Sequence, residues 1–286
     1  MMIPAETAAT ILVLVSALMH AAVNALIKVS DDGLLVRASM NAVALAVALP
    51  FTVTVPLPDA ELWQILIIAM LLHGLYPFAL VGAYRYGDLS SVFPLARGTA
   101  PLTVAILALV LGDGPERPER IAGALIIAGA IASLALERGR LGTSQAGKGL
   151  VLAVATGIVV GCYTIVDSIG LHMGTTPWTF IVWFFVLDGI FVTSAVGLVR
   201  WRAVPAFLRE NWRPGLLAGI LGVATYGLVL YALAIGSVVQ VAALRETSVI
   251  FGAIFGTFFL REPFGRRRLV AAIAVASGAA FMHAGR

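Results

Sequence analysis

Ten stretches of about twenty mainly apolar residues follow one another along this sequence. They fall at residues 7–29, 34–56, 62–84, 90–111, 120–137, 149–169, 178–199, 215–235, 238–260 and 267–283. A helix of about 20 residues is long enough to cross the ~30 Å hydrocarbon core of a bilayer. The sequence therefore predicts an all-α polytopic membrane protein with ten transmembrane helices.

The composition agrees with this prediction. Of the 286 residues, 60% are hydrophobic and only 12% are charged, which is outside the usual range of soluble domains. The connections between the apolar stretches are short and leave no room for a soluble domain of any size. The first stretch follows no basic segment and carries His20, Asn24 and Lys28. We therefore expect a retained helix there and not a cleaved signal peptide.

The two halves of the sequence share a pattern. One constant offset places Arg97 on Arg245 and aligns the fourth and fifth apolar stretches with the ninth and tenth. The unit is then five helices, and because five is odd, successive copies cross the membrane in opposite directions as an inverted repeat. We predict a first repeat at 1–138, a linker at 139–148 and a second repeat at 149–286.

The basic residues predict the orientation of the chain. Of the 19 lysines and arginines, fourteen fall in the odd-numbered loops, three fall on the opposite side and two lie inside apolar stretches. Basic loops stay in the cytoplasm. We therefore expect a multi-pass protein of the bacterial inner membrane with both termini in the periplasm.

The two arginines inside apolar stretches are the first candidates for a substrate site. Arg97 and Arg245 each lie about seven residues into their helices, ~10–11 Å deep and near the bilayer midplane. An ionised side chain there costs at least ~2.5–3.5 kcal/mol, so it needs a partner or a polar cavity. One interpretation is a pair of guanidinium groups that bind an anionic group. The alternative is structural, with Arg245 paired to Asp188 and Arg97 to another buried acid.

Several other polar and aromatic side chains fall near mid-depth in the predicted helices. His20 and Asn24 are spaced i, i+4 on one face of the first helix. Interhelical hydrogen bonding or packing is the alternative to ligand contact for each of these residues. The candidate substrate-binding residues are Arg97, Arg245, His20, Asn24, His73, Tyr76, Tyr163, Trp183 and Tyr226.

Three acids also lie inside the predicted helices. A carboxylate without a nearby cation in a low-dielectric region binds protons more readily, whereas one beside an arginine is a fixed counter-ion. Asp188 is the first candidate for proton coupling, and Asp167 and Glu246 follow.

The sequence gives no reason to expect an enzyme. It contains no G-x-S-x-G, P-loop or H-E-x-x-H motif, and its single cysteine, Cys162, can build neither a disulfide nor a cysteine-based zinc site. We expect no cofactor, no bound metal and no nucleic-acid partner.

Two related segments identify the family that this chain resembles. They are ARGTAPLTVAILALVLGD at 96–113 and LRETSVIFGAIFGTFFLREP at 244–263, each followed by a helix rich in glycine and alanine. Together with ten helices in two repeats, they resemble the EamA family of the drug/metabolite transporter superfamily. The segments HAAVNALIK, GDLSSVFPLARGTAPL, YTIVDSIG and ALRETSVIF are similar to a bacterial subgroup, some of whose members are associated with phosphonate-utilisation gene clusters. Asp113 stands where the family usually has Glu.

The resemblance implies a secondary transporter, an exporter or exchanger of small polar metabolites that works by alternating access. The intramembrane charges favour zwitterionic or anionic substrates such as amino acids or aminophosphonates, with the proton as a candidate coupling ion. The expected partners are a small-molecule substrate and the lipid bilayer, and the chain is expected to be a monomer or homodimer. Two other functions stay open at this point: a structural or sensory membrane subunit without transport, and a flippase for lipid-linked sugars.

Overall fold

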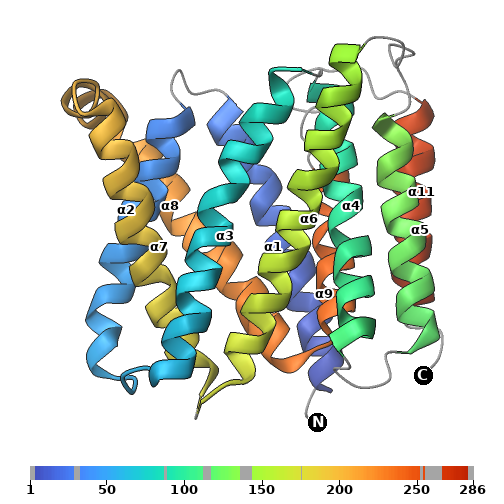
Figure 1. The fold of residues 1–286 in the computed structure, drawn as a ribbon, viewed down its shortest axis with the longest axis horizontal. Coiled ribbons are helices and arrows are strands. Elements are labelled where there is room, and N and C mark those ends of the chain that lie inside the picture. Colours follow the sequence, from blue (N-terminus) through green and yellow to red (C-terminus); the bar gives the residue numbers. More distant parts are fainter. Residues whose placement is uncertain are drawn as a thin grey trace.

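The computed structural model describes residues 4–28, 33–86, 89–111, 117–135, 144–174, 176–251, 254 and 266–282 (Figure 1). Within these ranges all regular structure is helical. The elements are α1 (Ala5–Lys28), α2 (Gly33–Ala48), η1 (Leu49–Val53), α3 (Ala60–Tyr84), α4 (Leu89–Leu111), α5 (Pro118–Ala135), α6 (Ser144–His172), α7 (Pro177–Arg200), α8 (Val204–Ile235), α9 (Val238–Arg245) and α11 (Arg266–Phe281).

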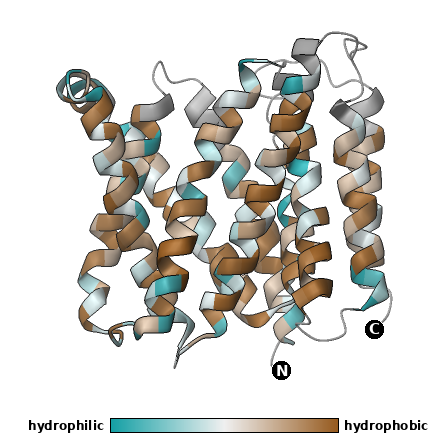
Figure 2. Cartoon of the chain, viewed as in Figure 1, coloured by the Kyte–Doolittle hydropathy of each residue, from teal (hydrophilic) through white to brown (hydrophobic). Residues whose placement is uncertain are grey.

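The helices form one bundle with an apolar outer surface. Seven of the described helices are long and apolar enough to cross a membrane. Large hydrophobic side chains such as Phe78, Val110 and Leu198 are more than 70% exposed, and Figure 2 shows hydrophobic residues along the length of the helices. Apolar surface of this extent is suited to contact with lipid. The prediction of an all-α polytopic membrane protein is confirmed, whereas the count of ten helices stays a prediction.

The second predicted helix is shorter than the apolar stretch 34–56. Helix α2 ends at Ala48, and the one-turn 3₁₀ helix η1 continues the chain with Pro50 in its first turn. Proline has no backbone N–H and clashes with the preceding turn of an α-helix, whereas it fits a first turn. The α-helix therefore stops here although the sequence remains apolar.

Two helices begin earlier than predicted. Helix α8 starts at Val204, inside the predicted connection 200–214, with a proline in its first turn. Helix α6 starts at Ser144, inside the predicted linker 139–148. These added turns contain residues of mixed polarity, and hydropathy identifies only the apolar part of a helix.

Many of the contacts between helices occur in matching sets. Helix α1 packs against α8 as α6 packs against α3, and α2 packs against α8 as α7 packs against α3. Likewise α4 packs against α6 as α9 packs against α1. Three further pairs each join the corresponding helices of the two halves: α2 with α7, α4 with α9 and α5 with α11. Exchanging the first five predicted helices with the second five reproduces this pattern. Two five-helix repeats would give such a pattern, and the repeat boundaries stay a prediction.

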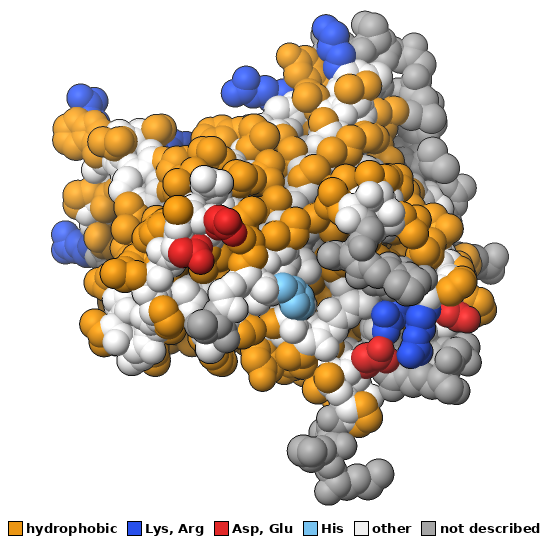
Figure 3. Space-filling view, turned by 60° about the horizontal axis from the view of Figure 1, so that its bottom comes forward, with side chains coloured by type: hydrophobic (Ala, Val, Ile, Leu, Met, Phe, Trp, Pro, Cys, Tyr) orange, Lys and Arg blue, Asp and Glu red, His pale blue; other side chains and the backbone are white. Residues whose placement is uncertain are grey.

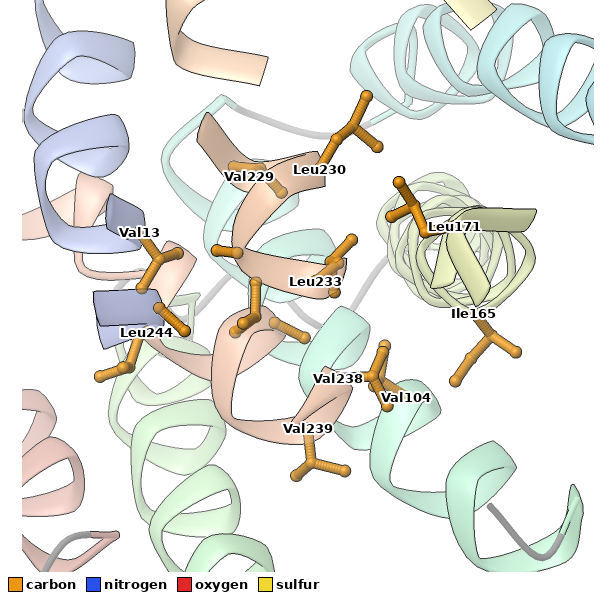
Figure 4. Close-up of a cluster of buried hydrophobic side chains, with 14 of the residues drawn as sticks. Val13, Val104, Ile165, Leu171, Val229, Leu230, Leu233, Val238, Val239 and Leu244 are labelled. Atoms are coloured by element: carbon orange, nitrogen blue, oxygen red, sulfur yellow. The ribbon is translucent and has the colours of Figure 1, made fainter. Parts of the chain in front are cut away.

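A cluster of buried hydrophobic side chains closes the lower end of the bundle, where both termini lie (Figure 1). It includes side chains from the start of α3 and α7 and from the ends of α6 and α8, and Figure 4 shows part of it between α1, α4, α6, α8 and α9. Leu66, Phe180 and Leu233 in this cluster are fully buried. Seen from this end, the surface is mainly hydrophobic, with a few small groups of charged side chains (Figure 3).

Glycine allows α6 to approach α4 closely. A Cβ atom on Gly157 would lie 2.5 Å from the carbonyl oxygen of Ala96 and 2.5 Å from Cβ of Thr99. We therefore expect Gly157→Ala to lower the free energy of unfolding by about 1–3 kcal/mol through overpacking. Thermal unfolding of the protein purified in detergent measures the effect.

Gly147 provides the matched control for this prediction. It lies on the same helix, and a Cβ atom there would meet nothing within 4 Å. We expect Gly147→Ala to leave the stability unchanged or to raise it by up to about 1 kcal/mol, because alanine is the better helix former. Equal destabilisation by both substitutions would contradict close packing at Gly157.

Candidate functional site

A cavity of about 130 Å³ lies inside the bundle, lined by α1, α2, α3, α4, α6, α7, α8 and α9. This volume is about ten times the ~10–15 Å³ that one water needs. Of the residues lining the cavity, Arg37 in the first turns of α2 is exposed. Because α2 begins at the upper end of the bundle in Figure 1, the cavity extends from the middle of the bundle toward that end. The hydrophobic cluster separates it from the lower end.

Arg97 of α4 is held by two side chains from other helices. Its Nη1 atom donates to Oε1 of Glu246 at 3.2 Å, and its Nη2 atom donates to Nε2 of His20 at 2.8 Å. Arginine carries only donors, so Nε2 of His20 acts as the acceptor and the ring proton of a neutral imidazole is then on Nδ1. Arg97 is 5% exposed and Glu246 is 2% exposed. The structural alternative for Arg97, pairing with a buried acid, is therefore present.

Arg245 of α9 has different surroundings. Its guanidinium carbon lies 5.2 Å from the ring centre of Tyr226 and 6.0 Å from that of Tyr163, within the range of cation–π attraction. Among the described residues, no carboxylate lies within 4.0 Å of this guanidinium, so the alternative pairing with Asp188 is not formed. Arg245 lines the cavity and can offer hydrogen-bond donors to an anionic group.

Three polar side chains meet beside Arg245. The hydroxyl of Tyr226 donates to Oδ2 of Asp167 at 2.5 Å, and Nε2 of His73 lies 3.0 Å from the same oxygen and 3.1 Å from the hydroxyl. The His73 ring also stacks on Tyr163, with ring centres 4.0 Å apart. Asp167 is fully buried. The cluster joins α3, α6 and α8 at the cavity wall.

A second acid lies on the cavity wall. Oδ2 of Asp188 on α7 accepts a hydrogen bond of 2.7 Å from Nδ2 of Asn41 on α2. Both residues line the cavity, and Asp188 is only partly buried. The cavity thus presents a carboxyl group on α7 and a guanidinium group on α9.

The helices that carry the site are interrupted next to it. Helix α9 ends at Arg245, and Glu246 and Thr247 form a turn with backbone bonds of the i to i−3 kind before the chain becomes helical again. The predicted continuous helix 238–260 is therefore wrong at this point, while most of its second part lies outside the described residues. Prolines inside α3 and α4 stand four residues after His73 and Arg97, so the carbonyl groups of those two residues lose their helical donors.

The structure brings most of the predicted site residues to one cavity. His20, His73, Tyr76, Arg97, Tyr163, Tyr226, Arg245 and Asp188 line it, and Asp167 and Glu246 contact lining residues. Trp183 is not among the lining residues, because its ring packs edge-on against Trp63 at 5.2 Å and its Nε1 donates to the carbonyl oxygen of Pro56. The side chain of Asn24 lies outside the described residues.

One charged and one amide side chain on the cavity wall were not predicted as site residues. Arg37 counted only as a basic loop residue, and Asn41 was not considered, although the structure places both on the cavity wall. Their spacing of four residues puts them on one face of a helix, and a polar pair on one face of an apolar stretch was the available signal.

Comparison with known proteins bears on the class of protein. Residues 147–283 match the EamA-like transporter family. This match covers just under half of the chain and supports the resemblance to the EamA family that the sequence motifs indicate. It is consistent with a membrane transporter of the drug/metabolite type.

The fold is also similar to that of a solved protein. One crystal structure aligns with 97% of this chain and 99% of its own, with a TM-score of 0.76 and 17% sequence identity. At this identity the likeness concerns the fold alone. A search of curated proteins by sequence gave no match.

Proposed function

We propose that this protein is a secondary transporter of small zwitterionic or anionic metabolites, such as amino acids or related compounds, that works by alternating access. The observation that carries the proposal is the environment of Arg245. Its charge lies at a cavity wall between two tyrosine rings, and among the described residues no carboxylate neutralises it at ion-pair distance. A carboxylate, sulfonate or phosphonate of the substrate would supply that partner.

The second charge of a zwitterion has a suitable partner in Asp188. This acid lies on the wall of the same cavity and is oriented by Asn41. An ammonium group bound there would leave the substrate's anionic group to Arg245. The pair of opposite charges disfavours simple cations, because Arg245 would repel them.

The closed lower end and the exposed Arg37 support a conformation that is open toward the upper end of the bundle. The upper end carries the loops with most of the basic residues, which we place in the cytoplasm of a bacterial cell. In this orientation the termini are periplasmic and the cavity is open to the cytoplasm. Transport requires a second conformation in which the two predicted repeats rock about the cavity.

Thermal stabilisation of the purified protein by a ligand panel tests the proposal. We expect one or more of L-alanine, L-glutamate, taurine and 2-aminoethylphosphonate to raise the melting temperature, because a ligand at 100 times its dissociation constant adds about 2.7 kcal/mol. The same compounds should exchange across proteoliposomes in counterflow. Choline, a cation without an anionic group, is the matched control.

Three outcomes would contradict the proposal. Stabilisation by choline without any effect of the zwitterions would show that the site binds cations and not zwitterions or anions. Stabilisation by an amino acid without counterflow would instead support a sensory subunit, and scrambling of lipid-linked sugars alone would support a flippase.

A further inference from the structure

We propose that Asp167, held by His73 and Tyr226, is a proton-binding site that is electrostatically coupled to Arg245, and this coupling rests on the proposed function of Arg245 as the anion-binding residue. The transporter would then bind one proton together with the anionic group of its substrate. The Asp167 carboxylate, the Tyr226 hydroxyl and His73 Nε2 form a three-way contact.

The hydrogen atoms in this cluster can be counted. Tyr226 has one proton and donates it to Oδ2 of Asp167. Nε2 of His73, which lies near both oxygen atoms, must then carry a proton to avoid facing two acceptors. The two donors converge on one carboxylate oxygen. The other oxygen, Oδ1, has no hydrogen-bond partner in the part of the chain that the structure describes, so it is the position open to an added proton.

The groups around the cluster come from each helix packed against it. The titratable or charged groups are His73 and Tyr76 on α3, Tyr163 on α6, Asp188 on α7, Tyr226 on α8 and Arg245 on α9. Arg97 on α4 and Glu246 pair with each other. Asp167 therefore has hydrogen-bond donors beside it, but no arginine or lysine within ion-pair distance among the described residues.

The other two intramembrane acids are less suited to bind a proton in this way. Glu246 is a counter-ion of Arg97, and losing its charge would leave a buried guanidinium without compensation. Asp188 lies at the cavity wall, where an ammonium group of the substrate can reach it. Asp167 is fully buried and accepts a hydrogen bond from Tyr226, whose ring also lies against Arg245. It is thus separated from the substrate position and yet close to the cation that binds the substrate.

Protonation forms one O–H bond on Asp167 and changes no other covalent bond. A proton from the cavity binds a carboxylate oxygen of Asp167 and converts the anion to a neutral acid, while Tyr226 and His73 keep their protons. The loss of this negative charge removes repulsion toward an anion at Arg245, so that anion binds more tightly. Because coupling between two sites is reciprocal, a bound anion raises the affinity of Asp167 for its proton by the same factor.

Infrared difference spectroscopy of the ligand-free protein in bilayers tests the site directly, with the proton as the probe. As the pH is lowered, we expect the wild type to gain a buried carboxylic-acid signal. Asp167→Asn should lack this signal, and the matched control Asp188→Asn should keep it. A signal that persists in Asp167→Asn would overturn the assignment of the proton to this residue.

Two further variants test the cluster and its coupling, and they decide the question even if Asp167→Asn does not fold. Tyr226→Phe removes a donor to the charged carboxylate, so the acid signal should persist to a pH about one unit higher, a tenfold gain in proton affinity. Arg245→Gln removes a nearby cation and should shift the signal in the same direction. An unchanged midpoint in Tyr226→Phe would overturn the site, and an unchanged midpoint in Arg245→Gln would overturn the coupling.

These spectra are recorded without substrate, so their outcome does not depend on the ligand panel. If no zwitterion binds but the signal behaves as expected, the proposed function fails and the proton site stands. If zwitterions bind but the signal persists in Asp167→Asn, the proposed function stands and the proton site fails.

Discussion

Replacing Arg97 by glutamine is expected to lower the free energy of unfolding by about 3–5 kcal/mol, because it leaves the Glu246 carboxylate buried without its cation. The same change removes the donor to Nε2 of His20. Unfolding in a mixture of mild and denaturing detergents measures the loss. A loss of this size would be a large part of the stability of a typical domain.

The matched variants for this prediction are Glu246→Gln and the double substitution. Glutamine at 246 keeps an oxygen that can accept from Arg97, so Glu246→Gln should destabilise less than Arg97→Gln. The double variant should lose less free energy of unfolding than the two single variants lose together, because no unpaired carboxylate remains in it. Strict additivity of the two losses would show that the two side chains do not interact.

Replacing Arg245 by lysine is expected to weaken binding of the best panel ligand by about 10- to 100-fold, since an ammonium group reproduces neither the contact of a planar guanidinium with the tyrosine rings nor the two-pronged hydrogen bond. The stability should stay close to that of the wild type, because the described residues leave no carboxylate unpaired by this change. Ligand titration and thermal unfolding on the same preparation measure both quantities.

The control for Arg245→Lys is the same substitution at Arg37. This arginine also lines the cavity, but its side chain is exposed, where hydrogen bonds to a ligand compete with water. We expect Arg37→Lys to change the affinity by less than about threefold. If Arg245→Lys bound the ligand as well as the wild type, the anion site would have to lie elsewhere on the cavity wall.

The sequence predicted the two arginines as site residues because each charge in an apolar stretch requires compensation. It did not reveal that the compensation differs, with a carboxylate and a histidine at Arg97 but tyrosine rings at Arg245. Which partners meet depends on the rotation and depth of helices that are far apart in the sequence. Hydropathy alone contains no such information.

The helix ends were likewise predicted only in part from the sequence. Apolar stretches predicted the membrane-crossing parts, whereas prolines and polar turns set the actual ends of α2 and the start of α8. The interruption after Arg245 follows no proline or glycine, and it coincides with the pairing of Glu246 to Arg97. Trp183 was predicted from depth alone, and depth does not say which face of α7 it occupies.

The hydrophobic cluster at the lower end has a thermodynamic consequence for any transport cycle of this protein. Opening that end would expose the side chains around Leu66, Phe180 and Leu233 to water. Exposure of apolar surface to water raises the heat capacity, so the enthalpy difference between the two open states would change with temperature. The equilibrium between these states would then follow a curved and not a straight van't Hoff plot.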